Sequence, residues 1–508
     1  MPNNTQRIAK NTVILYFRMF VMMAIGLYTS RIVLQTLGVK DYGTYNVVGG
    51  VMGMFSILTA SMASSISRFL TFELGRGDIE HLKKVFSTSM NVQMIMGAVI
   101  IVATEVVGVW FLNNKLNIPE GRMTAANWVF QFSIISFVLG LMMVPYNASI
   151  IAHEKMGVFA YMTFLDVGLK LLVVYSLYIS PFDKLISYSV LLFCVSLLMR
   201  SIYATYCRRH FEECKYRRIL DKKMLREITS YAGWGAVGDG AWILNNQGVN
   251  ILINIFFGVT LNAARGVAST VDNMVQKFVR NFMVALNPQI TKSYAAGDYE
   301  YMHKLVFFGA KYSFFMMLLF VIPICLETEL LLSLWLKTVP DYAVVFSQLS
   351  LLTSMCVLLG NTLTTSIAAT GKIRNYELIV GMMSLSIFPL TWIAFKLGMS
   401  PVSCYIIYFL VFFLMIFVKI KIVSRKIRMS GWDYIKNVVI KVIAVTVLSV
   451  MAPVFICVVQ EDSFIRLIEI GVVSFISTLF FVYYIGMSDY ERNYCVDIIK
   501  KKLNRKRS

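Results

Sequence analysis

The feature that most constrains this chain is a series of apolar runs, each about 20 residues long, the length that a helix needs to cross ~30 Å of hydrocarbon. Short polar segments separate the runs. The composition agrees, because 57% of the 508 residues are apolar or aromatic and 15% are charged, against roughly 25% charged in a soluble domain. The sequence therefore predicts an all-α, polytopic membrane protein.

Reading the apolar runs between polar, Pro and Gly residues gives about fourteen predicted transmembrane helices. They cover residues 11–35, 43–66, 85–112, 124–150, 156–180, 184–206, 229–257, 262–290, 305–327, 341–368, 376–395, 402–418, 438–458 and 466–486. The first run is full length and no cleavage site follows it, so we interpret it as a span and not as a removable signal.

The positive charges follow the pattern of membrane topology. Most of the 48 Lys and Arg residues fall in the polar segments that share a side with both termini, which predicts that both termini are cytoplasmic. The net charge of +20 is thus explained by topology, and no nucleic-acid partner is expected. The segments on the opposite side are short and leave no room for a catalytic domain.

An internal repeat divides the chain. A shift of 220 residues aligns the loops and helix starts around the second and eighth spans, and a shift of 217 aligns NASIIAHEK at 147–155 with TTSIAATGK at 364–372. Because each repeat holds an even number of spans, both halves have the same orientation, which implies an approximate two-fold axis along the membrane normal. We predict an N-lobe at 1–206, a basic linker at 207–228, a C-lobe at 229–424, a final helix pair at 425–490 and a basic tail at 491–508. The positions aligned by the first shift are Gly38, Val39, Val47, Val51, Met54, Gly77, Asp78, Glu80 and Lys84 with Gly258, Val259, Val267, Val271, Met274, Gly297, Asp298, Glu300 and Lys304.

Several motifs resemble a known family. The opening RIAKNTVILYF, the LGVKDYGTYNVVGG turn and the FELGRGD loop, with this order of spans, resemble Wzx-type polysaccharide and O-antigen flippases of the multidrug/oligosaccharidyl-lipid/polysaccharide (MOP) exporter superfamily. The resemblance implies two lobes in a bacterial inner membrane. It also implies alternating access that moves undecaprenyl-pyrophosphate-linked oligosaccharide to the outer leaflet for lipopolysaccharide and other surface polysaccharides. Membrane lipids, a polysaccharide polymerase and glycosyltransferases are the partners that it implies.

Charges inside the predicted spans are mostly cationic, and each costs at least ~2.5 kcal/mol at a helix centre unless it is used. Arg18, Arg31 and Arg265 are the cavity candidates, because a guanidinium binds pyrophosphate oxygens in a bidentate way. Arg31 has an alternative explanation, in which its side chain extends to the outer membrane interface.

The seventh and eighth spans carry polar stripes. Arg265, Ser269, Asp272, Gln276 and Arg280 recur at steps of three or four residues and share one side of a helix. They fit either a cleft wall for phosphate and sugar or a buried ion-pair ladder against a neighbouring helix, and Arg280 also fits an interface anchor. On the seventh span, Asn246, Asn250 and Asn254 share a face and suit either sugar hydroxyls or interhelical hydrogen bonds.

No phosphate-binding loop, zinc motif or nucleophile elbow appears, so we predict no cofactor, no metal site and no enzymatic activity. The membrane potential favours outward movement of an anion by ~2.3 kcal/mol per charge per 100 mV. Asp239 and Glu105 are the candidates for coupling to an ion.

Two other kinds of function compete with this interpretation. A cation-coupled multidrug exporter or a lipid II flippase belongs to the same superfamily, and the drug exporter predicts an acidic cavity. A membrane polysaccharide polymerase or acyltransferase would need a long extracytoplasmic loop or paired acids at the interface, and neither is visible in the sequence.

Overall fold

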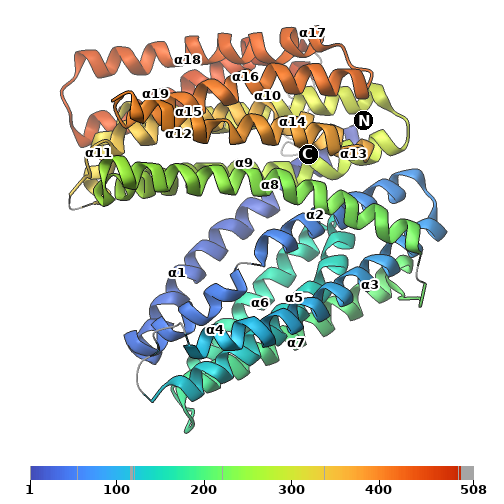
Figure 1. Cartoon of the computed structure of the whole chain (residues 1–508). Helices are drawn as coiled ribbons and strands as arrows, with labels where there is room; N and C mark the ends of the chain where they lie inside the picture. Colours follow the sequence, from blue (N-terminus) through green and yellow to red (C-terminus); the bar gives the residue numbers. More distant parts are fainter. Residues whose placement is uncertain are drawn as a thin grey trace, which may run out of the picture. The chain divides into compact units, whose positions relative to one another are not determined.

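The computed structural model describes residues 2–53, 55–114, 118, 121–219, 221–336, 338–489 and 491–493, and all the regular structure in these ranges is helical (Figure 1). Two compact units emerge from the contacts within the chain. Unit 1 comprises residues up to Gly240 together with Thr291–Gly297, and unit 2 comprises Ala241–Ile290 and the residues from Asp298 onward. The lobe and linker limits drawn from the sequence stay a prediction.

Unit 1 contains the first seven helices and the beginning of the eighth. Its elements are α1 (Pro2–Gly53), α2 (Ser56–Arg76), α3 (Ile79–Ala103), the π-helix η1 (Thr104–Gly108), α4 (Val109–Asn114), α5 (Met123–Ala152), α6 (Met156–Ser176), α7 (Lys184–His210) and the short 3₁₀ helix η2 (Glu212–Cys214). Helix α5 packs against α2, α3 and α7, and α1 packs against α6. The core includes Phe86 and Tyr146, whose ring centroids are 5.3 Å apart.

Two long helices belong to both units. Helix α8 (Lys222–Phe257) passes from unit 1 into unit 2 after Gly240, about halfway along its length, and α9 (Val259–Ala295) lies in unit 2 up to Ile290 and ends in unit 1. The rest of unit 2 comprises α10 (Tyr299–Leu326), α11 (Thr328–Trp335), α12 (Ala343–Leu359), α13 (Asn361–Thr370), α14 (Arg374–Leu385), α15 (Ile387–Lys396), α16 (Val402–Lys426), α17 (Gly431–Tyr434), η3 (Ile435–Val439), α18 (Ile440–Val459), α19 (Phe464–Phe481) and η4 (Val482–Gly486). Helix α12 packs against α10 and α16, and the pair α18 and α19 packs against α10.

Ten helical segments in the described ranges are long and apolar enough to cross a membrane. The polytopic, all-α prediction is therefore confirmed, whereas the inner-membrane location and the cytoplasmic termini stay predictions. The remaining predicted spans fall on α1, α2, α8 and α9. Helices α8 and α9 have 36 and 37 residues, so length does not exclude them. Their polar stripes keep them out of this set, because amides and charges lower the mean hydropathy along both helices.

The helix-ending turns aligned by the repeat have the same local structure in both copies. Gly77 and Gly297 have φ of 75° and 76°, and the aspartate that follows each of them caps the next helix. Asp78 accepts the backbone N–H of His81, and Asp298 accepts that of Tyr301, both at 3.0 Å. This turn chemistry ends one helix and starts the next.

The other aligned breaks also match. Gly38 interrupts α1 with φ 78°, and Gly258 separates α8 from α9 with φ 85°. At the second alignment Glu154 has φ 58° and its counterpart Gly371 has φ 76°. A positive φ is rare outside glycine, so three matched positions support the repeat predicted from the sequence.

Two ion pairs hold the C-terminal segment against the rest of unit 2. At one end Lys311 of α10, 4% exposed, donates to Glu491 Oε2 at 2.9 Å and to the carbonyl oxygen of Gly486 at 3.1 Å. At the other end Arg466 of α19 binds both carboxylate oxygens of Glu327 at 2.7 and 3.1 Å. The charge of Lys311, which lies inside a predicted span, is thus satisfied by a structural contact.

Candidate functional site

The polar faces of α8 and α9 meet in unit 2 because the chain reverses at Gly258. Its positive φ suits glycine, and its N–H donates to the carbonyl oxygen of Asn254 at 2.9 Å. The turn brings Asn246 on α8 next to Arg265 on α9. These two predicted site residues are in direct contact.

Arg265 is a buried cation, with 5% of its surface exposed. Its Nη2 donates to Asn246 Oδ1 at 2.5 Å and to the hydroxyl of Tyr408 at 3.4 Å. The guanidinium carbon lies 5.7 and 5.6 Å from the ring centroids of Tyr405 and Tyr408, within reach of a cation–π attraction. Asn245 donates to the same Tyr408 hydroxyl at 3.0 Å and so orients that ring.

No carboxylate among the described residues contacts Arg265. Its partners are an amide, a backbone carbonyl and a tyrosine hydroxyl, and its Nη1 is buried without a hydrogen-bond partner in the described part of the chain. Burying a charge without a counter-ion is costly. The site therefore offers a positive charge and a free N–H donor, which together suit an anion with oxygen acceptors such as phosphate.

A cavity of about 370 Å³ adjoins this guanidinium. Amides line it on both helices, and the Oδ1 atom of Asn262 is buried without a partner in the described ranges. Asn250 donates to Gln247 Oε1 at 3.4 Å and keeps a second N–H. The cavity can thus both donate to and accept from hydroxyl groups. Its lining comprises Asn250, Ile251, Asn254, Asn262, Arg265, Gly266 and Ser269.

Further along α9, the side chains of the polar stripe contact one another, although Asp272 Oδ1 is buried without a partner among the described residues. Gln276 Nε2 donates to Asp272 Oδ2 at 2.7 Å and to Ser354 Oγ of α12 at 2.9 Å, and Arg280 donates to Gln276 Oε1 at 3.3 Å. These contacts are hydrogen bonds within α9 and to α12, and they leave both interpretations of the stripe open. The substrate-binding role of Asp272, Gln276 and Arg280 stays a prediction.

The arginines of the first span lie in unit 1. Arg18 donates to Thr163 Oγ1 at 3.5 Å, and its guanidinium carbon lies 4.3 Å from the ring centroid of Phe159. It is therefore held between α1 and α6, with a buried Nε that has no partner among the described residues. The side chain of Arg31 lies outside the described residues.

The two acids predicted to couple transport to an ion lie in different surroundings. Glu105 sits in the π-helix η1 and accepts a hydrogen bond from Gln131 at 3.2 Å. Asp239 is exposed, in the part of α8 that belongs to unit 1. Asp166 and Lys170, one helical turn apart on α6, form a local ion pair at 2.7 Å.

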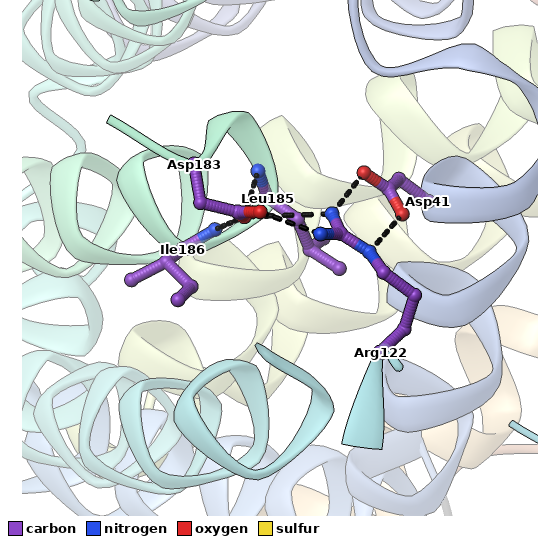
Figure 2. Close-up of polar contacts among 5 residues, drawn as sticks. All are labelled: Asp41, Arg122, Asp183, Leu185 and Ile186. Atoms are coloured by element: carbon purple, nitrogen blue, oxygen red, sulfur yellow. Dashed lines mark hydrogen bonds and ion pairs between the residues drawn. The ribbon is translucent and has the colours of Figure 1, made fainter. Parts of the chain in front are cut away.

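A second polar cluster, which the sequence did not suggest, joins three segments of unit 1 (Figure 2). Figure 2 shows the guanidinium of Arg122, just before α5, between the carboxylates of Asp41 on α1 and Asp183 before α7. Asp183 also accepts the backbone N–H groups of Leu185 and Ile186 at 3.0 Å. Burial acts to raise the pKa of Asp183, but these hydrogen bonds outweigh it and lower that pKa below its ordinary value.

Sequence reasoning also missed Tyr405 and Tyr408, because a tyrosine in an apolar run reads as core. One signal was available. Both lie near the start of the predicted span 402–418, and Arg265 lies near the start of the span 262–290, so all three were expected at the same end of the membrane.

Comparison of the sequence with known proteins gives one distant match. No protein-family model matches the chain. The uncharacterized membrane protein EpsK of Bacillus subtilis (strain 168) is similar at 16% identity over 277 residues, which is 54% of this chain and 55% of EpsK.

The structural matches are longer. A crystal structure of MATE in the straight conformation matches with a TM-score of 0.71 and 12% identity, covering 84% of this chain and 96% of the other. An outward-facing multidrug resistance MATE family transporter of the MOP superfamily gives 0.68 at 12% identity, covering 83% and 96%. This chain has the same fold as these MATE structures. A MOP superfamily transporter from Pyrococcus furiosus, for which a reverse polarity of the binding pocket has been described, gives 0.66 at 12% identity and covers 84% and 96%.

Proposed function

We propose that this chain is a flippase that carries undecaprenyl-pyrophosphate-linked oligosaccharide from the cytoplasmic to the outer leaflet. The supporting observation is Arg265, a buried cation without a carboxylate partner among the described residues and with an unused N–H at the edge of a polar cavity. A pyrophosphate supplies the missing negative charge and the missing acceptor. The amides of α8 and α9 then accept hydrogen bonds from sugar hydroxyls, and donate hydrogen bonds to them, as the sugar leaves water.

The polarity of the site supports this cargo over a cationic drug. The described lining of the cavity holds one arginine, three asparagines and no carboxylate, so a cation would meet repulsion and no counter-charge. In the MOP superfamily transporter from Pyrococcus furiosus, a reverse polarity of the binding pocket suggests a different function. We likewise use the positive polarity of the cavity beside Arg265 to infer an anionic cargo. Arg18 is the second proposed phosphate contact, with a buried Nε that lacks a partner in the described residues.

The test is complementation of a strain that lacks this gene, with surface polysaccharide and accumulated lipid-linked oligosaccharide as readouts. Arg265→Ala removes charge-assisted hydrogen bonds worth about 1.5–3 kcal/mol, so we expect at least about a tenfold loss of transport rate. Arg265→Lys keeps the charge but loses the bidentate geometry, so its transport rate should lie between those of the wild type and Arg265→Ala.

The matched control is Arg217→Ala, because Arg217 is 51% exposed and its side chain pairs with the exposed Glu80. This variant should complement like the wild type, and the membrane level of each variant is measured with a fluorescent fusion. Full complementation by Arg265→Ala at a normal membrane level would show that this arginine does not bind the cargo.

A cation-coupled multidrug exporter is the second candidate. The multidrug resistance named for one structural match and the exposed acid Asp239 favour it. It predicts that overexpression confers resistance to cationic dyes and that Asp239→Asn abolishes this resistance. The flippase proposal predicts no dye resistance, so the same strains separate the two candidates.

A further inference from the structure

A second cavity, of about 610 Å³, opens between α1 and the end of α6, entirely within unit 1. We call it the tyrosine groove. Three tyrosines and one glutamine supply its polar groups, and its described lining contains no charged side chain. Its lining residues are Tyr28, Ile32 and Gln35 from α1, and Tyr175, Tyr178 and Ile179 from the end of α6 and the turn after it.

The α1 side of the groove is one helix face, because Tyr28, Ile32 and Gln35 follow at steps of four and three. On the other side, Tyr175 lies at the end of α6 and Tyr178 in the turn that follows it. The hydroxyls of Tyr28 and Tyr175 lie 2.7 Å apart across the groove. The exposed fractions of Tyr28, Tyr175 and Tyr178 are 51%, 43% and 57%, so all three rings remain open to a ligand.

We propose that the tyrosine groove binds a neutral sugar ring of the cargo, a proposal that rests on the flippase function above. A pyranose has an apolar C–H face and a rim of hydroxyls. The negative face of a tyrosine ring attracts polarised C–H groups, and phenol and amide groups both donate to and accept from hydroxyls. The groove volume lies within the range of roughly 300–1,000 Å³ found for small-molecule sites.

The chemistry of the groove selects a sugar over the phosphate. A pyrophosphate needs cationic donors, and the described lining has none. Arg18 lies along the same pair of helices, ten residues before Tyr28, a separation of about 15 Å along a helix axis. The α1–α6 pair of unit 1 thus presents a charged contact and a neutral aromatic contact in succession.

A belt of tyrosines at the membrane interface is an alternative explanation of these rings that needs no ligand. In such a belt the hydroxyls point individually toward headgroups and water. In the tyrosine groove two hydroxyls instead pair with each other, and both of their rings line the same cavity. Tyr161 provides the contrast on the same helix, because it is 77% exposed and does not line the groove.

The test measures binding of two lipids to the purified full chain in nanodiscs. One probe is undecaprenyl pyrophosphate without sugar, and the other is the lipid-linked oligosaccharide extracted from the strain that lacks this gene. The double variant Tyr28→Ala/Tyr175→Ala should weaken binding of the sugar-bearing lipid by about three- to tenfold and leave the bare lipid unchanged. Tyr161→Ala should change neither, and Tyr175→Phe should keep part of the preference for the sugar.

The outcomes separate this inference from the proposed function. An equal loss for both lipids, or no loss for either, would overturn the sugar site. If Arg265→Ala then still weakens both lipids, the flippase proposal stands alone. If the wild type binds neither lipid, both proposals fail.

Discussion

Removal of Arg466 should destabilise the protein more than removal of its partner Glu327. Both side chains are buried, 9% and 1% exposed, and they share two hydrogen bonds of 2.7 and 3.1 Å. The consequences of losing one partner differ, however, because Arg466 has two further acceptors at ordinary hydrogen-bonding distance, whereas the other described contact of the Glu327 carboxylate is a weak one with a thiol. Arg466 also donates to the carbonyl oxygen of Gln460 at 2.9 Å and pairs with Asp462.

These contacts set the magnitudes. Arg466→Met leaves the Glu327 carboxylate buried with the thiol of Cys457 at 3.9 Å, and an uncompensated buried charge costs about 3–5 kcal/mol. Glu327→Met leaves an arginine that keeps two acceptors, so its cost should be nearer to the ~1–3 kcal/mol of a lost hydrogen-bond partner. The double variant replaces both charges with apolar groups, and we expect it to be more stable than Arg466→Met.

Equilibrium unfolding in mixed micelles of sodium dodecyl sulfate and dodecyl maltoside, followed by circular dichroism, gives the free energies for this double-mutant cycle. The expected coupling between the two positions is about 2–3 kcal/mol. Two results would refute the reasoning: equal costs for the two single variants, or a double variant whose cost is the sum of the single costs.

Two further predictions concern unit 1. Because the pKa of Asp183 is lowered in the folded state, its charge should stabilise the protein fully above the ordinary pKa of 3.8, and this contribution should disappear as the pH falls through the folded-state pKa. Asp183→Asn keeps the helix cap, so an unfolding series against pH should show it less stable than the wild type at neutral pH and equal to it in acid. Gly75→Ala should cost about 1–3 kcal/mol, because its Cβ would lie 2.9 Å from the backbone of Lys292. Gly140→Ala, which meets nothing within 4 Å, is the control, and equal thermal stabilities of the two variants would contradict this account.

Much of the fold was predictable because its signals are local. Apolar runs set the spans, and the turn residues of the repeat act within a few positions of themselves. Gly77 with Asp78 and Gly297 with Asp298 each end one helix and cap the next. Such chemistry can be read from neighbouring letters of the sequence without knowledge of the tertiary structure.

The candidate site was predictable only in part. Asn246 and Arg265 lie on adjacent helices joined by a short turn, so the sequence could bring their stripes together. Tyr405 and Tyr408 reach Arg265 from α16, more than a hundred residues away, and nothing in the local pattern specifies that packing. The contact of Arg122 with Asp41 and Asp183 is of the same kind, because it needs three segments to meet in space.

The hydropathy of unit 2 links its fold to the proposed site. Six apolar helical segments in the described part of the unit qualify as spans on composition, and α8 and α9 do not. A helix with amides and an arginine inserts less favourably than an apolar one, so such residues persist where they form contacts that offset the cost. Gln276 and Asp272 Oδ2 find such contacts within the protein, whereas Nη1 of Arg265 and Oδ1 of Asn262, like Oδ1 of Asp272, find none among the described residues. Arg265 and Asn262 both line the cavity, so two of these unused hydrogen-bonding atoms lie where a phosphorylated and hydroxylated cargo would use them.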